Sequence, residues 1–170
     1  MRLSFLPTMI VESVTDLTPE LLMHRGIGLL MLDFDNTIVP YTRNEPTEEM
    51  DAWLKMMVSS DVKLCVVSNT RKDRVNQFCA PYGIPVIMRA KKPGTGGIYE
   101  ALGKFGYAQD EAALVGDQIF TDTFAANNAH VRSILVEAID NHNIWLKLRH
   151  VAELPFIFAA RKRRINHEKS

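Results

Sequence analysis

Acidic side chains follow two of the apolar segments that the sequence predicts as buried strands. Asp33 and Asp35 stand at the end of the apolar run 27–34, and Asp117 follows the run 112–115. Residues two apart in an extended backbone point to the same side, so Asp33 and Asp35 are expected to project together. Close carboxylates repel one another unless they share a cation or a proton. With Asp117 they predict an oxygen-rich pocket suited to Mg²⁺.

A hydroxyl, an ammonium group and a further carboxylate follow the remaining strand ends. Ser68 and Asn69 come directly after one apolar run, and Lys91 and Lys92 follow another. Asp122 stands five residues after the third acid. Ligands of open parallel sheets bind outside the carboxyl ends of the strands. The sequence therefore predicts that these groups meet at one edge of a sheet.

Each of these residues also has an ordinary structural interpretation. An isolated Asp at a strand end commonly caps a helix, and this applies to Asp122. The segment 68–70 could cap the helix that follows it, and Lys91 and Lys92 could be solvated loop charges. The glycine-rich segment 94–97 is interpreted as a flexible loop entering a helix rather than as a phosphate cradle.

Short apolar runs alternate with helical stripes along the chain. Thr18 is expected to cap a helix, because a proline and an acidic residue follow it directly. After Thr47 the apolar residues recur with the spacing of a second, amphipathic helix. The predicted strands span 27–34, 62–67, 85–88, 112–115 and 131–136, and further helices are expected near 71–80, 98–105 and 119–128. This order predicts an α/β fold, a doubly wound parallel sheet of about five strands with helices on both faces.

Length and charge narrow the class of protein. The 170 residues carry 20 basic and 20 acidic side chains, so the formal net charge is zero. The chain as a whole therefore has no positive electrostatic field that would favour binding to nucleic acid. Basic residues concentrate at the end, which predicts a single domain over 1–155 and a basic tail over 156–170. No Cys/His cluster has zinc spacing. Cys65 and Cys79 lie in apolar stretches, as expected of buried reduced thiols in the cytoplasm.

Four motifs in this order resemble the haloacid dehalogenase-like phosphohydrolase superfamily. The resemblance covers about residues 25–136, and the opening segment and third motif are similar to the class IIIA, YqeG-like phosphatase family. The motifs are Asp33-Phe34-Asp35-Asn36-Thr37, Ser68, Lys92-Pro93 and Gly116-Asp117 with Asp122.

The resemblance implies a Rossmann-like fold and a role for each matched residue. Asp33 is expected to attack phosphorus and form an aspartyl-phosphate, with Asp35 as general acid and base. The implied Mg²⁺ ligands are the Asp33 and Asp117 side chains and the Asp35 backbone carbonyl. The implied substrate-binding residues are Asn36, Thr37, Ser68, Asn69 and Lys92; Ser68 and Lys92 also count as catalytic. Asp122 is expected to orient Lys92 or a metal-bound water. Lys91 is the alternative to Lys92 as the phosphate-binding lysine of the third motif.

Family members gain specificity from inserted cap domains, and the gaps between the motifs are short here. Only 30 residues separate Thr37 from Ser68, and 23 separate Ser68 from Lys92. We therefore expect a capless phosphatase whose open site admits bulky phosphorylated substrates. Small sugars would fit if a second subunit of a homo-oligomer covered the site. The YqeG-like group is distantly similar to mitochondrial phosphatidylglycerophosphate phosphatases, and this resemblance makes that phospholipid one candidate substrate.

The C-terminal residues raise the question of partners. A helix is expected over 144–152, followed by an aromatic segment and the basic run 161–164. Such a tail could contact an anionic membrane peripherally, or it could be frayed and solvated; RNA is a lesser alternative. Two other functions are alternatives: a signalling receiver domain, and a non-catalytic adaptor that binds phosphate groups, membrane or RNA.

Overall fold

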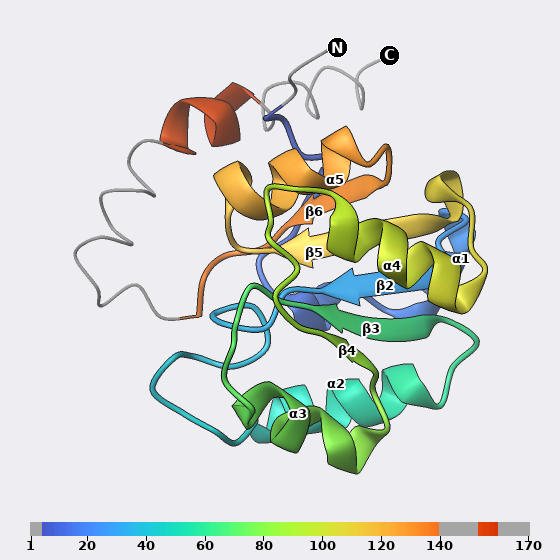
Figure 1. Cartoon of the computed structure of the whole chain (residues 1–170), viewed down its shortest axis with the longest axis vertical. Helices are drawn as coiled ribbons and strands as arrows, with labels where there is room; N and C mark the ends of the chain where they lie inside the picture. Colours follow the sequence, from blue (N-terminus) through green and yellow to red (C-terminus); the bar gives the residue numbers. More distant parts are fainter. Residues whose placement is uncertain (1–4, 140–152, 160–170) are drawn as a thin grey trace.

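Six parallel strands form one sheet in the part of the chain that the structure describes (Figure 1). The structure is a computed structural model, and it describes residues 5–139 and 153–159. The order of the strands across the sheet is β1-β6-β5-β2-β3-β4, and every neighbouring pair is parallel. The strands are β1 (Met9–Ile10), β2 (Leu29–Leu32), β3 (Lys63–Val67), β4 (Val86–Ile87), β5 (Ala112–Gly116) and β6 (Arg132–Leu135). The predicted α/β parallel sheet is confirmed.

One edge strand was not predicted. β1 contains only two residues, and it pairs with β6 through Met9 opposite Ile134 and Ile10 opposite Leu135. Two residues are too few to show an alternating pattern, so only the pairing reveals this strand.

Helices cover both faces of the sheet. They are α1 (Pro19–His24), α2 (Glu48–Val58), α3 (Arg74–Cys79), α4 (Gly96–Phe105) and α5 (Phe124–Asn128), together with a helix over 153–159. Figure 1 shows α2 and α3 on one side of the sheet and α4 and α5 on the other. The expected cap of α1 is confirmed, because Thr18 accepts a hydrogen bond from the Leu21 N–H. Thr47 caps α2 in the same way and accepts one from the Met50 N–H.

The central strand β2 separates two apolar cores. Leu30 and Leu32 pack in the core that includes α2 and α3, whereas Leu29 and Met31 pack in the core that includes α4 and α5. All four side chains have 0% of their surface exposed. Burial on both faces explains why this strand is apolar throughout rather than alternating.

The two cysteines lie in different cores. Cys65 belongs to the α4 side of the sheet and Cys79 to the α3 side, and both are free thiols. Burial raises the pKa of each thiol to about 12, so both stay protonated at neutral pH. The prediction of buried, reduced thiols is confirmed.

The sheet changes direction of growth at β2. From β2 the chain adds β3 and β4 on one side, then crosses over through α4 to add β5 and β6 on the other side. Such a switch point opens a crevice at the carboxyl ends of the strands. Figure 1 shows the arrows of β2, β3 and β5 pointing to the same edge, where the connecting loops gather.

The connections between the strands carry no inserted domain. Residues 38–67 contain α2 and β3, and residues 69–91 contain α3, a short 3-10 turn (Ala80–Tyr82) and β4. The expectation of a capless fold is confirmed.

The glycine-rich segment 94–97 was predicted to be a flexible loop, but its second half belongs to α4. Gly96 and Gly97 form the first turn of α4. A Cβ atom on Gly97 would lie 2.6 Å from the Ala90 Cβ, so the missing side chain lets α4 pack against the segment that follows β4.

A second correction concerns the helix expected over 119–128. Its first part is a π-helix, Ile119–Thr123, and α5 begins only at Phe124.

The described C-terminal helix spans the predicted boundary between domain and tail. Residues 153–159 are helical, and the Phe156 ring packs against Phe5 and Phe120, with ring centroids 5.3 and 6.0 Å apart. The predicted helix 144–152 and the basic run 161–164 lie outside the described residues. No helix in the described ranges is long and apolar enough to cross a membrane.

Candidate active site

Asp33 lies at the carboxyl end of the central strand. Its N–H donates to the Val115 carbonyl at 2.8 Å, which continues the pairing of β2 with β5, and only 7% of the residue is exposed. Burial raises the pKa of Asp33 to about 7, although the neighbouring Lys92 ammonium lowers it. The structure thus places a poorly solvated carboxylate at the switch point of the sheet.

Lys92 is the lysine that reaches this carboxylate. Its Nζ lies 2.6 Å from Asp33 Oδ1 and 2.7 Å from Asp122 Oδ1. Burial disfavours the charged amine, but the Asp122 and Asp33 carboxylates outweigh that effect and raise the pKa of Lys92. Lys91, the competing candidate, is exposed and lies outside this cluster.

Asn69 holds the main chain of Lys92. Its Oδ1 accepts a hydrogen bond from the Lys92 N–H at 2.7 Å, and its Nδ2 donates to the Lys92 carbonyl at 2.8 Å. Both ends of the side-chain amide are therefore engaged by backbone. This geometry suits a residue that positions Lys92, and the substrate-binding role of Asn69 stays a prediction.

Two other buried acids, Asp117 and Asp122, gather around Asp33. Carboxylate oxygens of Asp33, Asp117 and Asp122 all lie within 4.8 Å of one another. Three carboxylates and the Lys92 ammonium leave two formal negative charges in a buried space, which a divalent cation would balance. Carboxylate oxygens are the donors that hard cations prefer, so the residues present fit such an ion. Asp122, expected only to orient Lys92 or a metal-bound water, is part of this group.

Gly116 makes the close approach of Asp122 possible. A Cβ atom at position 116 would overlap the Asp122 carboxyl group. That carboxylate also accepts a hydrogen bond from the Gln118 N–H at 3.2 Å. The glycine of the fourth motif therefore has a steric reason, and Asp122 is oriented by both the Gln118 N–H and Lys92.

Asp35 faces a different cation from Asp33. It is half-buried, and its Oδ1 lies 3.2 Å from the Arg74 guanidinium. Burial raises the pKa of Asp35, while Arg74, Lys72 and Lys92 oppose the rise. Arg74 also donates to the Tyr41 carbonyl at 2.9 Å, so it links the start of α3 to the loop after β2.

Arg74 was not predicted as a residue of the site. Its partners are more than thirty residues away in the chain, and no local pattern marks an arginine at the start of a helix as part of a site.

Asn36 and Thr37 shape the turn after the central strand. Asn36 adopts the left-handed backbone conformation with φ 63°, which asparagine tolerates better than most residues. Its N–H donates to the Val39 carbonyl at 2.8 Å. The Thr37 hydroxyl is buried and has no hydrogen-bond partner among the described residues. Their substrate-binding roles stay predictions.

Ser68 does not cap the helix that follows it. Its hydroxyl accepts a hydrogen bond from the Thr70 N–H at 3.2 Å, and α3 begins only at Arg74. With 2% of its surface exposed, Ser68 lies at the end of β3, next to the β2 end that carries Asp33. The alternative of a helix cap is wrong, and a role at the site stays a prediction.

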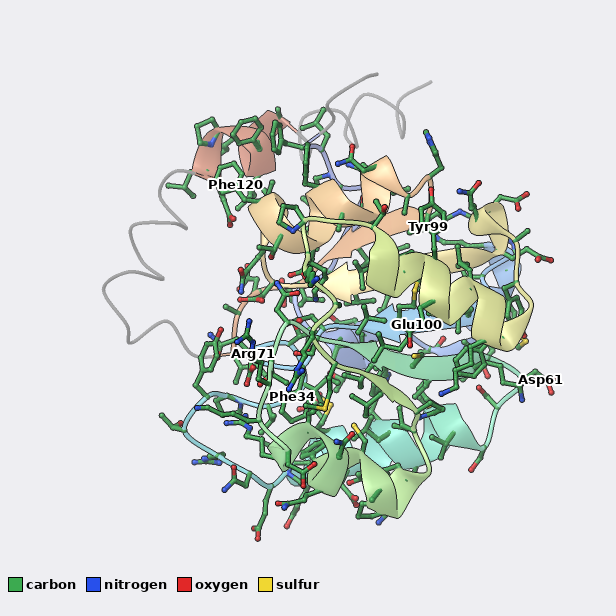
Figure 2. All side chains as sticks on the ribbon, in the orientation of Figure 1. Phe34, Asp61, Arg71, Tyr99, Glu100 and Phe120 are labelled. Atoms are coloured by element: carbon green, nitrogen blue, oxygen red, sulfur yellow. The ribbon has the colours of Figure 1, made fainter. Side chains whose placement is uncertain are left out.

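Glu153 is a second residue that the sequence analysis missed. Its exposed fraction is 2%, and its Oε1 accepts hydrogen bonds from the N–H groups of Ile119 and Phe120 at 3.0 and 3.4 Å. These amides begin two residues after Asp117. Glu153 thus connects the C-terminal helix to the loop that carries two of the three acids, and Figure 2 shows the labelled Phe120 beside that helix.

The two histidines in the described part of the chain give no alternative metal centre. His24 and His130 are exposed, and His142, His150 and His167 lie outside the described residues. Within the described ranges, the aspartate triad is the only group of such residues close enough to share an ion.

We expect Glu153→Ala to destabilise the protein by about 1–3 kcal/mol, because the buried Ile119 N–H and the partly buried Phe120 N–H lose their acceptor. Glu153→Gln keeps an acceptor oxygen and should lose less. Urea unfolding measures both, with Glu100→Ala on the exposed face of α4 as the control. A Glu153→Ala variant as stable as this control would contradict the assigned contact.

Comparisons with known proteins agree with this geometry. The family described as haloacid dehalogenase-like hydrolase matches residues 13–136. A Bacillus subtilis (strain 168) protein named "Probable phosphatase YqeG" is 33% identical over 132 residues, which cover 78% of this chain and 77% of that protein.

Two solved structures share the fold. An uncharacterized protein from Listeria monocytogenes serotype 4b aligns with a TM-score of 0.56 and 17% identity, over 69% of this chain and 84% of that one. The cobalt-bound deoxy-D-mannose-octulosonate 8-phosphate phosphatase (YrbI) from Haemophilus influenzae aligns with a TM-score of 0.53 and 14% identity, over 74% and 75%. Together with the motifs at the strand ends, the matches show that this chain belongs to the haloacid dehalogenase-like hydrolase family.

Proposed function

We propose that this hydrolase is a Mg²⁺-dependent phosphatase that cleaves phosphoric monoesters through an aspartyl-phosphate on Asp33. Family membership and the similarity to a protein named as a phosphatase support the reaction class. The observation that carries the proposal is the placement of Asp33. This one buried carboxylate contacts the Lys92 ammonium and belongs to the acid triad, at the carboxyl end of the central strand.

In the proposed reaction, an Asp33 oxygen forms a bond to phosphorus while the bond from phosphorus to the leaving oxygen breaks. Two anions must approach each other for this step, so positive charge beside Asp33 is essential. The Lys92 ammonium supplies part of it, held in place by the Asp122 carboxylate and by the Asn69 contacts with its main chain. Ser68 would bind a phosphoryl oxygen at the neighbouring strand end.

Asp35 is the proposed acid and base. It would donate a proton to the leaving oxygen, and later take one from the water that attacks the aspartyl-phosphate and releases phosphate from Asp33. Arg74 limits how far the Asp35 side chain turns, because the guanidinium is itself held by the Tyr41 carbonyl. The two acids of the first motif thus face different cations and take different roles.

The Asp33 and Asp117 side chains would hold the Mg²⁺, with the Asp35 backbone carbonyl as a further ligand. When bound, the ion supplies charge neutralisation between the Asp33 carboxylate and the phosphate group. The acid triad supports this assignment, and the cobalt-bound form of the Haemophilus influenzae phosphatase is consistent with a divalent ion on this fold.

The carboxyl edge of the sheet supports bulky substrates, because the described connections between the strands carry no inserted domain that would cover it. Phosphatidylglycerophosphate is one candidate, and hydrolysis of a short-chain form by the purified protein would test it. Membrane contact through the basic tail, a cytoplasmic location and a homo-oligomer stay predictions. Membership of the hydrolase family argues against the alternative of a signalling receiver domain. Hydrolysis of p-nitrophenyl phosphate distinguishes the phosphatase from the non-catalytic adaptor, which would not hydrolyse it.

We expect Asp33→Asn to reduce hydrolysis of p-nitrophenyl phosphate by at least about a thousandfold, because the nucleophile is lost. The matched control is Asp61→Asn, an exposed acid on the approach to β3, which should hydrolyse the substrate like the unmodified protein. Circular dichroism checks that both variants fold. Turnover by a folded Asp33→Asn variant at the rate of the control would reject Asp33 as nucleophile.

We also expect EDTA to abolish turnover and Mg²⁺ to restore it. Independently of activity, Mg²⁺ should raise the thermal unfolding midpoint, because an ion that binds only the folded chain stabilises it. Asp117→Asn should remove most of that shift, whereas Asp61→Asn should keep it. Full activity in EDTA, or an equal shift in both variants, would count against the metal assignment.

A further inference from the structure

An open pocket of about 490 Å³ lies beside the site and is lined by basic side chains. The lining residues are Asn69, Arg71, Arg89 and Lys91, and three of these four are cationic. They come from the loops that follow β3 and β4, at the carboxyl edge of the sheet. Figure 2 shows the labelled Arg71 at that edge.

The pocket adjoins the proposed catalytic residues. Asn69 follows Ser68 in the chain, and Lys91 precedes Lys92. Two hydrogen bonds fix the 89–92 segment to the end of β3: the Ala90 N–H donates to the Ser68 carbonyl at 3.0 Å, and the Lys92 N–H donates to Asn69 Oδ1 at 2.7 Å. The pocket and the site therefore share a wall, and their relative positions are set by backbone contacts.

Within residues 5–139 and 153–159, the pocket cations differ from the two cations of the site in having no carboxylate partner. Lys92 and Arg74 each contact an aspartate. Arg71, Arg89 and Lys91 are exposed and make no ion pair with any described residue. The chain as a whole has a net charge of zero, so this concentration of positive charge is local. Neighbouring like charges repel, and an anion between them would relieve the repulsion.

The backbone keeps these side chains facing outward at a conformational cost. Arg89 and Lys91 have φ values of 53° and 56°, in the left-handed region that residues with a side chain disfavour. The alternation leaves Ala90 and Lys92 buried and Arg89 and Lys91 exposed. Unfavourable backbone conformations persist where the surroundings enforce them, often at sites of function. Here they place two cations on one side of a segment whose other side carries Lys92.

We propose that this pocket binds a second phosphate group of the substrate, next to the phosphomonoester that Asp33 attacks. The inference rests on the proposed function and specifies its substrate class: a molecule with two phosphate groups, the second being a monoester or a diester. Arginine suits this role because its planar guanidinium donates two parallel hydrogen bonds to phosphate oxygens. The volume lies within the range of small-molecule pockets.

The test compares a substrate that fills the pocket with one that does not. The first is a series of straight-chain diol bisphosphates of increasing length, and the second is the matched alkyl monophosphates together with p-nitrophenyl phosphate. The unmodified protein should prefer one length of bisphosphate over its monophosphate by about tenfold or more in kcat/KM. A preference for no bisphosphate of any length would overturn the proposal.

Variants locate the preference. Arg71→Gln with Arg89→Gln should lower kcat/KM for the preferred bisphosphate by about tenfold or more, mostly through KM, and leave p-nitrophenyl phosphate unchanged within about twofold. Lys63→Gln with Lys104→Gln removes two exposed charges elsewhere and is the matched control. Equal losses on both kinds of substrate, or equal losses in the control, would overturn the pocket assignment.

Two further arms separate the possible outcomes. Short-chain phosphatidylglycerophosphate carries a diester beside its monoester, so a larger preference for it than for the diol series assigns the second phosphate to a lipid headgroup, and the reverse assigns it to a soluble bisphosphate. Calorimetric titration of the diol series tests binding without turnover, and loss of binding in the arginine variant supports the pocket. Turnover of p-nitrophenyl phosphate by the unmodified protein, together with an unchanged kcat/KM for the bisphosphates in the arginine variant, rejects the pocket alone. Absence of turnover by the unmodified protein rejects the phosphatase.

Discussion

The contact of one buried ammonium with two buried carboxylates is the constraint on which the site depends. Lys92 lies 2.6 and 2.7 Å from Asp33 and Asp122, and all three residues are almost fully excluded from solvent. Unpaired charges in such a place would be strongly unfavourable. The surrounding structure keeps the three together: Asn69 binds the lysine main chain, and the bare backbone of Gly116 leaves room for the Asp122 carboxyl group.

The sheet explains why these charges meet where they do. β2 is buried on both faces and has β5 and β3 as neighbours, so the residue after β2 lies between the ends of those two strands. Asp33 occupies that place, Asp117 follows β5 and Ser68 follows β3. Parallel pairing brings polar ends to one edge, and the reversal of growth at β2 opens the space between them. The apolar cores on both faces therefore fix the positions of the strand ends, and the polar site lies beyond the cores at those ends.

Positive charge at this edge is divided between two environments. Lys92 and Arg74 are paired with aspartates of the site, which fixes their positions. The cations of the neighbouring pocket are exposed and have no acid beside them among the described residues, so they are free to meet an anion from solution. A buried lysine needs permanent partners because it cannot be solvated, whereas exposed arginines keep water until a ligand replaces it. Within the short segment 89–92, Lys92 lies on the buried side and Arg89 and Lys91 lie on the exposed side.

Local patterns were sufficient to predict the order of strands and helices, the doubly buried central strand and the acids at the strand ends. Apolar periodicity and caps report burial and termini within a few residues of chain, and parallel pairing then sends every strand end to one edge. The partners of individual side chains depended on the fold. Asn69 and Lys92 are 23 residues apart, and Glu153 and Ile119 are 34 apart. The short edge strand, the choice of Lys92 over Lys91 and the basic pocket likewise arise from contacts between distant segments. Only packing in three dimensions specifies such contacts, because no spacing along the chain records which loop lies against which.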